Sequence, residues 1–116
     1  MTESFDVAGL DSLIAELTVD AYGEEEELDG LLVGAEEALS AGEVATVVGV
    51  PVRITAVKAG PDARRGLIAV CERGGSRHEV SLADVAFHQT SELGCVAAAY
   101  RRWLGCDPSP SLSASP

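Results

Sequence analysis

Residues 44–57 read VATVVGVPVRITAV, and this stretch decides the fold class. It is rich in β-branched residues, and Val50, Val52 and Ile54 alternate with residues of other types. Alternation with a period of two is typical of a strand that buries one face. Pro51 has no backbone N–H, so it belongs at a sheet edge, a strand start or a bulge. The stretch therefore predicts β-structure in the middle of the chain.

Further strand signals follow toward the C-terminus. Residues 60–62 (GPD) indicate a turn, and residues 67–71 (LIAVC) form an apolar run of strand length. The chain turns again at residues 74–75 (GG), and His78, Val80 and Leu82 alternate with polar residues in the segment 77–82 (RHEVSL). We therefore expect four to five short strands that form a small, strongly bent antiparallel sheet or a partly open barrel.

Two helical patterns precede the strands. One stripe predicts a helix over about residues 9–19, and a second predicts a helix that follows the acids Glu24–Glu27, where the helix dipole favours negative charge. The two stripes consist of Leu10, Leu13, Ile14 and Leu17, and of Leu28, Leu31, Leu32, Ala35 and Leu39. Gly30 and Gly34 cost the second helix about 1 kcal/mol each relative to alanine, so tertiary packing must hold it. The pair predicts an antiparallel helical hairpin with an acidic outer face.

A last helix is predicted over residues 91–104, with Thr90 or Ser91 as its cap and Gly105 at its end. We expect its Trp103 to close the edge of the core. The chain is thus predicted to be one α+β domain with a disordered Ser/Pro tail. The predicted domain spans residues 1–106 and consists of an acidic helical part (1–43), a β part (44–88) and a closing helix (89–106). The predicted tail spans residues 107–116.

The charge of the chain is distributed unevenly. The 116 residues carry a net charge of −11, from 19 acidic and 8 basic residues. Residues 1–44 hold 13 of the acids and no lysine or arginine. Such a balance argues against binding to nucleic acid or to an anionic membrane, both of which need a basic surface. Only 4% of the residues are aromatic, which also disfavours a base-stacking platform.

The acids of the second helix are the main candidate site. They can be a solvated helix face, or they can present an acidic surface to a basic protein partner or to a second copy of the chain. The candidate residues are Glu24, Glu25, Glu26, Glu27, Asp29, Glu36 and Glu37. The second interpretation predicts a non-enzymatic binding or regulatory module. A cytoplasmic location is expected, because the chain has an odd number of cysteines (3), no secretory signal and no membrane span.

Calcium binding by residues 20–36 is the alternative. Glu25, Glu27, Asp29, Gly30 and Glu36 occupy positions 1, 3, 5, 6 and 12 of an EF-hand loop. The match is loose, because the first ligand is normally aspartate and the residue at position 9 has no side-chain oxygen. The same residues also carry the helical stripe. Otherwise no cofactor is expected.

An enzyme is the third and least favoured interpretation. Cys71 and His78 can face each other across a hairpin, as a thiol nucleophile and its base would need to. Cys71 lies in an apolar strand, however, which would raise its pKa and leave the thiol inert. The spacing of Cys71, His78, His88 and Cys95 fits no common zinc pattern. The chain also has no phosphate-binding or nucleophile-elbow motif, so we expect no catalytic residue.

Basic residues gather in the predicted sheet and its turns. They can neutralise the acidic helices within the chain, or they can form an exposed face that docks an acidic partner. These residues are Arg53, Lys58, Arg64, Arg65, Arg73 and Arg77.

Two segments resemble a family of small acidic bacterial proteins of unassigned function. They are residues 14–23 (IAELTVDAYG) and 98–105 (AAYRRWLG). The resemblance implies an acidic helical start, a sheet-rich middle and a similar closing helix. Some members are labelled putative calcium-binding proteins, and that label would fall on Glu25, Glu27, Asp29 and Glu36.

Overall fold

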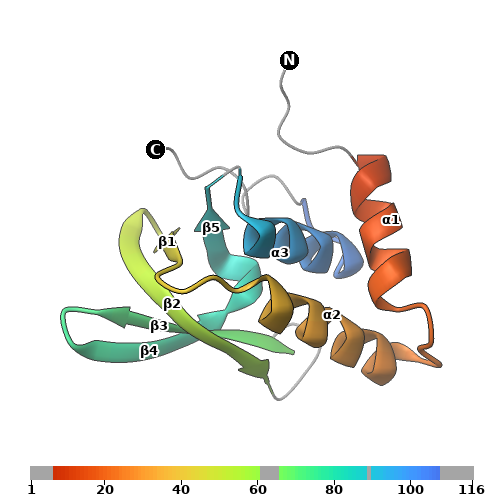
Figure 1. The fold of residues 1–116 in the computed structure, drawn as a ribbon, viewed down its shortest axis with the longest axis horizontal. Helices are drawn as coiled ribbons and strands as arrows, with labels where there is room; N and C mark the ends of the chain where they lie inside the picture. The colour runs from red at the N-terminus through yellow and green to blue at the C-terminus, as the bar shows by residue number, and fades with distance from the viewer. Residues whose placement is uncertain (1–6, 61–65, 89, 108–116) are drawn as a thin grey trace.

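The computed structural model describes residues 7–60, 66–88 and 90–107, and it has the predicted α+β class (Figure 1). Its helices are α1 (Val7–Leu17), α2 (Glu24–Ala38) and α3 (Glu92–Trp103). Its strands are β1 (Val44–Val47), β2 (Val50–Ala59), β3 (Leu67–Arg73), β4 (Ser76–Ser81) and β5 (Val85–Phe87). A short 3-10 helix, η1 (Leu82–Asp84), joins β4 to β5. Among the described residues, no helix has the length and apolar character needed to cross a bilayer.

The five strands form one antiparallel sheet in the order β4-β3-β2-β1-β5. The sheet does not close, since β4 and β5 lie at its edges. Pro51 is the second residue of β2 and pairs only with β1, because β3 begins to pair at Arg53. Its missing N–H therefore costs the sheet no hydrogen bond to β3. The register of β2 and β3 shifts between Ile54 and Ala56, which marks an irregularity of the kind found at bulges.

The core lies between the sheet and the helices. Leu31 and Ala35 of α2, Ile54 of β2 and Tyr100 of α3 are buried in one cluster. The Tyr100 hydroxyl accepts a hydrogen bond from the Leu67 N–H at 3.3 Å, which ties α3 to β3.

The helix α3 begins and ends where the sequence pattern predicted. The Ser91 hydroxyl accepts a hydrogen bond from the Gly94 N–H at 2.9 Å, so Ser91 is the predicted cap. Trp103 packs against the core beside Tyr100, with ring centroids 6.2 Å apart, and closes its edge as expected. Gly105 follows with a φ of 85°, the left-handed conformation that commonly ends a helix.

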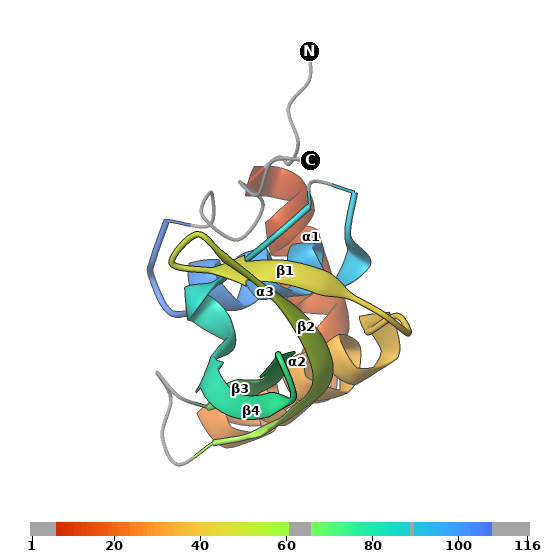
Figure 2. The same cartoon turned by 90° about the vertical axis from the view of Figure 1, so that its left-hand side faces the viewer.

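The helix α1 crosses α2 at its two glycines. A Cβ on Gly30 would lie 2.1 Å from the Leu17 carbonyl oxygen, and a Cβ on Gly34 would lie 2.8 Å from the Leu17 Cδ2. The glycines that weaken α2 intrinsically are thus the ones that let α1 approach. Figures 1 and 2 show the two helices meeting at an angle instead of lying side by side. The predicted antiparallel hairpin is therefore not confirmed.

Several boundaries differ from the expectation. The acids Glu24–Glu27 form the first turn of α2 instead of preceding the helix, since glutamate is a good helix former and the dipole favours it there. Leu82 begins η1 and does not belong to β4. A two-residue turn at Val48–Gly49 divides the stretch 44–57 into β1 and β2. The predicted tail lies outside the described residues, apart from Asp107.

Candidate functional site

All seven acids of the predicted surface lie in α2. Six are exposed, and Glu27 is half-buried. Two of the seven have structural contacts: Glu26 Oε1 accepts a hydrogen bond from the Tyr22 N–H at 2.8 Å, and Glu27 Oε1 accepts one from the Trp103 indole N–H at 2.9 Å. These two side chains hold the start of α2 and join α2 to α3.

Four other acids share one exposed face of α2. Residues spaced at i, i+4, i+8, i+11 and i+12 lie on one side of a helix. The residues at this spacing are Glu25, Asp29, Val33, Glu36 and Glu37, and all five are exposed. We call this set the acidic stripe. Val33, which is 50% exposed, is the apolar residue in the middle of it.

Part of the acidic stripe opposes the stability of its own helix. Glu36 and Glu37 lie in the last turn of α2, where the helix dipole disfavours negative charge. No basic residue lies in that turn to offset them. Glu25 and Asp29 form an i, i+4 pair of like charge, which costs a few tenths of a kcal/mol. The positions of Glu36 and Glu37 are therefore not explained by helix stability, whereas Glu25 lies in the first turn, where the dipole favours it.

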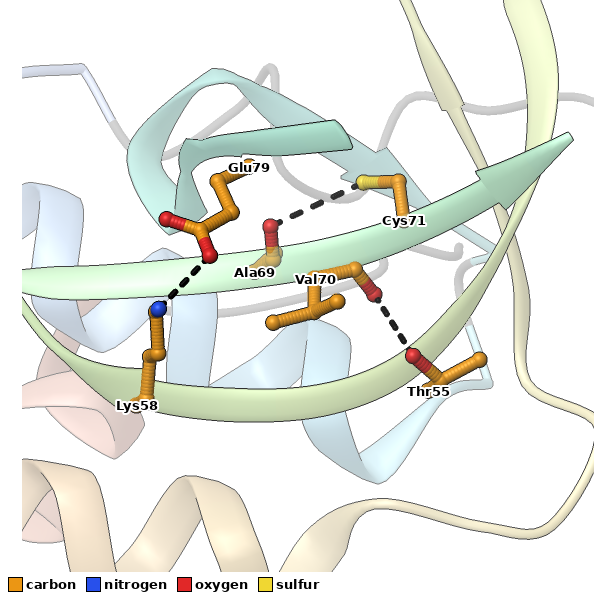
Figure 3. A network of polar contacts seen from close by, with 6 residues as sticks. All are labelled: Thr55, Lys58, Ala69, Val70, Cys71 and Glu79. Atoms are coloured by element: carbon orange, nitrogen blue, oxygen red, sulfur yellow. Dashed lines mark hydrogen bonds and ion pairs between the residues drawn. The ribbon is translucent and has the colours of Figure 1, made fainter. Parts of the chain in front are cut away.

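The basic residues that form ion pairs in the described part of the chain pair with acids outside α2. Lys58 forms an ion pair with Glu79 at 2.6 Å, within the sheet (Figure 3). Arg102 pairs with Asp11, which lowers the pKa of the Asp11 carboxyl, chiefly through the hydrogen bond from the guanidinium. In the described part of the chain, no lysine or arginine forms an ion pair with the acidic stripe. Arg64 and Arg65 lie outside the described residues.

The four residues of the calcium hypothesis lie along a helix and not around a loop. Glu25 and Glu36 are separated by about 16 Å along the axis at a rise of about 1.5 Å per residue. Calcium ligands surround one ion at about 2.4 Å. Glu27 points to Trp103 instead of to the acidic stripe. The described residues contain no group of three or more acids, histidines or cysteines placed to hold a metal ion.

Cys71 and His78 are directly opposite in the register of β3 and β4, as the hairpin pattern predicted. His78 is exposed at the surface, and Cys71 is only 1% exposed. Burial raises the pKa of the Cys71 thiol. Its sulfur lies 3.8 Å from the Ala69 carbonyl oxygen, to which the thiol donates (Figure 3). A buried, protonated thiol is a poor nucleophile.

Cys71 should resist alkylation in the folded chain, because both access and thiolate character are lacking. We expect iodoacetamide to leave Cys71 unmodified until urea unfolds the protein, and peptide mass mapping measures this. The partly exposed Cys106 serves as the internal control. Equal modification of both cysteines in the folded chain would contradict this account.

A groove that no sequence pattern predicted lies at one end of the sheet. It has a volume of about 630 Å³ and is lined by β1, β2, β3 and β4. Valines provide most of its apolar surface, and two arginines, one histidine and the acid Glu79 also line it. We call it the sheet-end groove. Its residues include Val47, Val50, Val52, Arg73, Arg77 and His78.

Comparison of the chain with protein-family models, curated proteins and solved structures finds no match. The resemblance carried by residues 14–23 and 98–105 therefore stays a prediction.

Proposed function

We propose that the protein is a non-enzymatic binding module whose acidic stripe recognises a basic protein surface. One observation carries the proposal: Glu36 and Glu37 are exposed in the last turn of α2, where they oppose the helix dipole. Within the described residues no basic side chain pairs with them. Charges that reduce stability and have no internal partner are suited to an external one.

The recognition would be electrostatic in its first step. A dense negative surface attracts a basic partner over distances of about one Debye length, roughly 8 Å at physiological salt. This steering raises the association rate more than it lowers the dissociation rate. Val33 adds an apolar contact in the middle of the charges.

A charge-matched pair of variants tests the proposal. Neutralising the stripe should weaken binding of a fluorescent oligoarginine peptide about fivefold, since three exposed charge contacts contribute about 1 kcal/mol together. Fluorescence anisotropy at physiological salt measures the affinity. The stripe variant combines Glu25→Gln, Asp29→Asn and Glu36→Gln.

The control removes the same number of charges elsewhere on the surface. It combines Glu16→Gln, Asp20→Asn and Glu92→Gln, three exposed acids that do not lie on α2. Its affinity for oligoarginine should stay within about twofold of the wild type. If both variants lose affinity equally, only the net charge matters, and the acidic stripe is not a binding surface.

A further inference from the structure

The large exposed apolar residues fall into two separate groups. Val19, Tyr22 and Val33 lie in α2 or just before it, and Val44, Val48 and Val50 lie in β1, β2 and the turn between them. Figure 1 places the N-terminal end of α2 and the turn between β3 and β4 at opposite ends of the molecule. Within the second group, Val50 lines the sheet-end groove, and Val48 lies in the turn between the lining residues Val47 and Val50.

Val48 is held in a conformation that valine rarely adopts. With Gly49 it forms the two-residue turn between β1 and β2, and the φ angles of the two residues are 50° and 77°. Both are positive, as a type I′ turn requires, and such turns favour Asn-Gly. A β-branched residue in this region is a conformational outlier. The Val48 side chain is 95% exposed, so packing within the chain does not offset the strain.

The sheet-end groove carries positively charged side chains, whereas the acidic stripe is negatively charged. Arg73, Arg77 and His78 line it beside the valines. Arg73 donates a hydrogen bond to the Pro51 carbonyl oxygen at 3.1 Å and so lies across β2. Arg77 is exposed and, within the described residues, has no ion-pair partner. The groove thus combines an apolar surface with the positive charge of two arginines, while the one carboxylate that lines it, Glu79, pairs with Lys58.

We propose that the acidic stripe of one copy docks in the sheet-end groove of a second copy. An acidic helix with a central exposed valine, Val33, meets an apolar groove with basic side chains, which is the chemistry of helix-in-groove recognition. This inference rests on the proposed function and names the partner as the chain itself. Because the acidic stripe lies on α2 and the groove on the strands, each contact joins two different surfaces, so the association is head-to-tail.

The net charge makes this association weak and gives it a characteristic salt response. Two chains that each carry −11 repel one another at long range. Added salt screens this repulsion as well as the local attraction between stripe and groove. Self-association should therefore change little with salt, whereas binding of the cationic oligoarginine should fall steeply. This difference separates the two kinds of partner.

Complementary variants test the head-to-tail contact by sedimentation velocity. The wild type should show a mass that rises with concentration between about 10 μM and 1 mM, the range of weak complexes. Asp29→Lys changes only the stripe, and Arg77→Glu changes only the groove. Each variant alone should stay monomeric. A mixture of the two should form a one-to-one dimer, because each copy retains one intact surface.

Two control variants are measured by sedimentation velocity in the same way. Glu16→Lys and Arg53→Glu carry the same charge changes outside both surfaces and should associate like the wild type. A monomeric wild type, or a mixture of Asp29→Lys and Arg77→Glu that stays monomeric, overturns the head-to-tail contact. If oligoarginine binding still depends on the stripe in that case, the proposed function survives with a different basic partner. If that dependence is absent as well, both proposals fail.

Discussion

Replacing Gly30 with alanine should lower the free energy of unfolding by about 2–3 kcal/mol, the largest effect expected from a single methyl group in this chain. The added Cβ would lie 2.1 Å from the Leu17 carbonyl oxygen, which is far inside van der Waals contact. The obstacle is backbone, so α1 as a whole must move away from α2. The alanine gains about 1 kcal/mol of helix propensity, which is too little to offset that movement.

Two variants on the same helix provide the controls. At Gly34 the added Cβ meets only the end of the Leu17 side chain, 2.8 Å away, and a side chain can rotate. Gly34→Ala should therefore change the stability by less than about 1 kcal/mol. Asp29→Ala, at an exposed position, should be neutral or slightly stabilising. Urea denaturation followed by circular dichroism measures all three. Equal losses at Gly30 and Gly34 would contradict the described crossing of α1 and α2.

Replacing Val48 with asparagine should raise the free energy of unfolding by about 1–1.5 kcal/mol. Asparagine adopts a positive φ more readily than any β-branched residue, and Asn-Gly is the preferred pair for this turn. Nothing is lost in packing, since the Val48 side chain is 95% exposed. The gain comes from removing conformational strain alone. The same variant should weaken self-association, because it removes an apolar side chain beside the sheet-end groove.

Val44→Asn is the matched control for this prediction. Val44 is exposed as well, but it lies in β1 without a positive φ. Asparagine is disfavoured in strands, so this variant should lower the stability by up to about 1 kcal/mol. Thermal unfolding of both variants measures the difference. If Val48→Asn destabilises the protein as Val44→Asn does, the turn is not strained.

The periodicity of apolar residues predicted most of the elements. Leu31 and Ala35, two residues of the predicted helical stripe, are buried as expected, and Ile54 faces the core from β2. The turn at Val48–Gly49 was missed, because the favoured sequence of such a turn is Asn-Gly and a valine gives no turn signal. The low helix propensity of Gly30 and Gly34 indicated that this helix is intrinsically weak. Their role at the crossing depends on Leu17, whose position in space no local pattern reveals.

The candidate site was predictable only in part. The uneven charge located the acids of α2, and the hairpin pattern correctly paired Cys71 with His78. Helical spacing then separates the acidic stripe from Glu27, which contacts Trp103 in α3. The sheet-end groove was not predictable, since it brings together strands that are distant in sequence. Such a hollow depends on tertiary structure and has no periodicity.

The central claim is that the acidic stripe of α2 is a binding surface, and an NMR titration tests it most directly. Oligoarginine would be added to the ¹⁵N-labelled chain while the backbone amide signals are followed. We expect the largest shifts within α2, around Asp29, Val33 and Glu36, and small shifts at the exposed acids Glu16 and Glu92. Shifts of equal size at all exposed acids, or shifts that leave α2 unchanged, would contradict the claim.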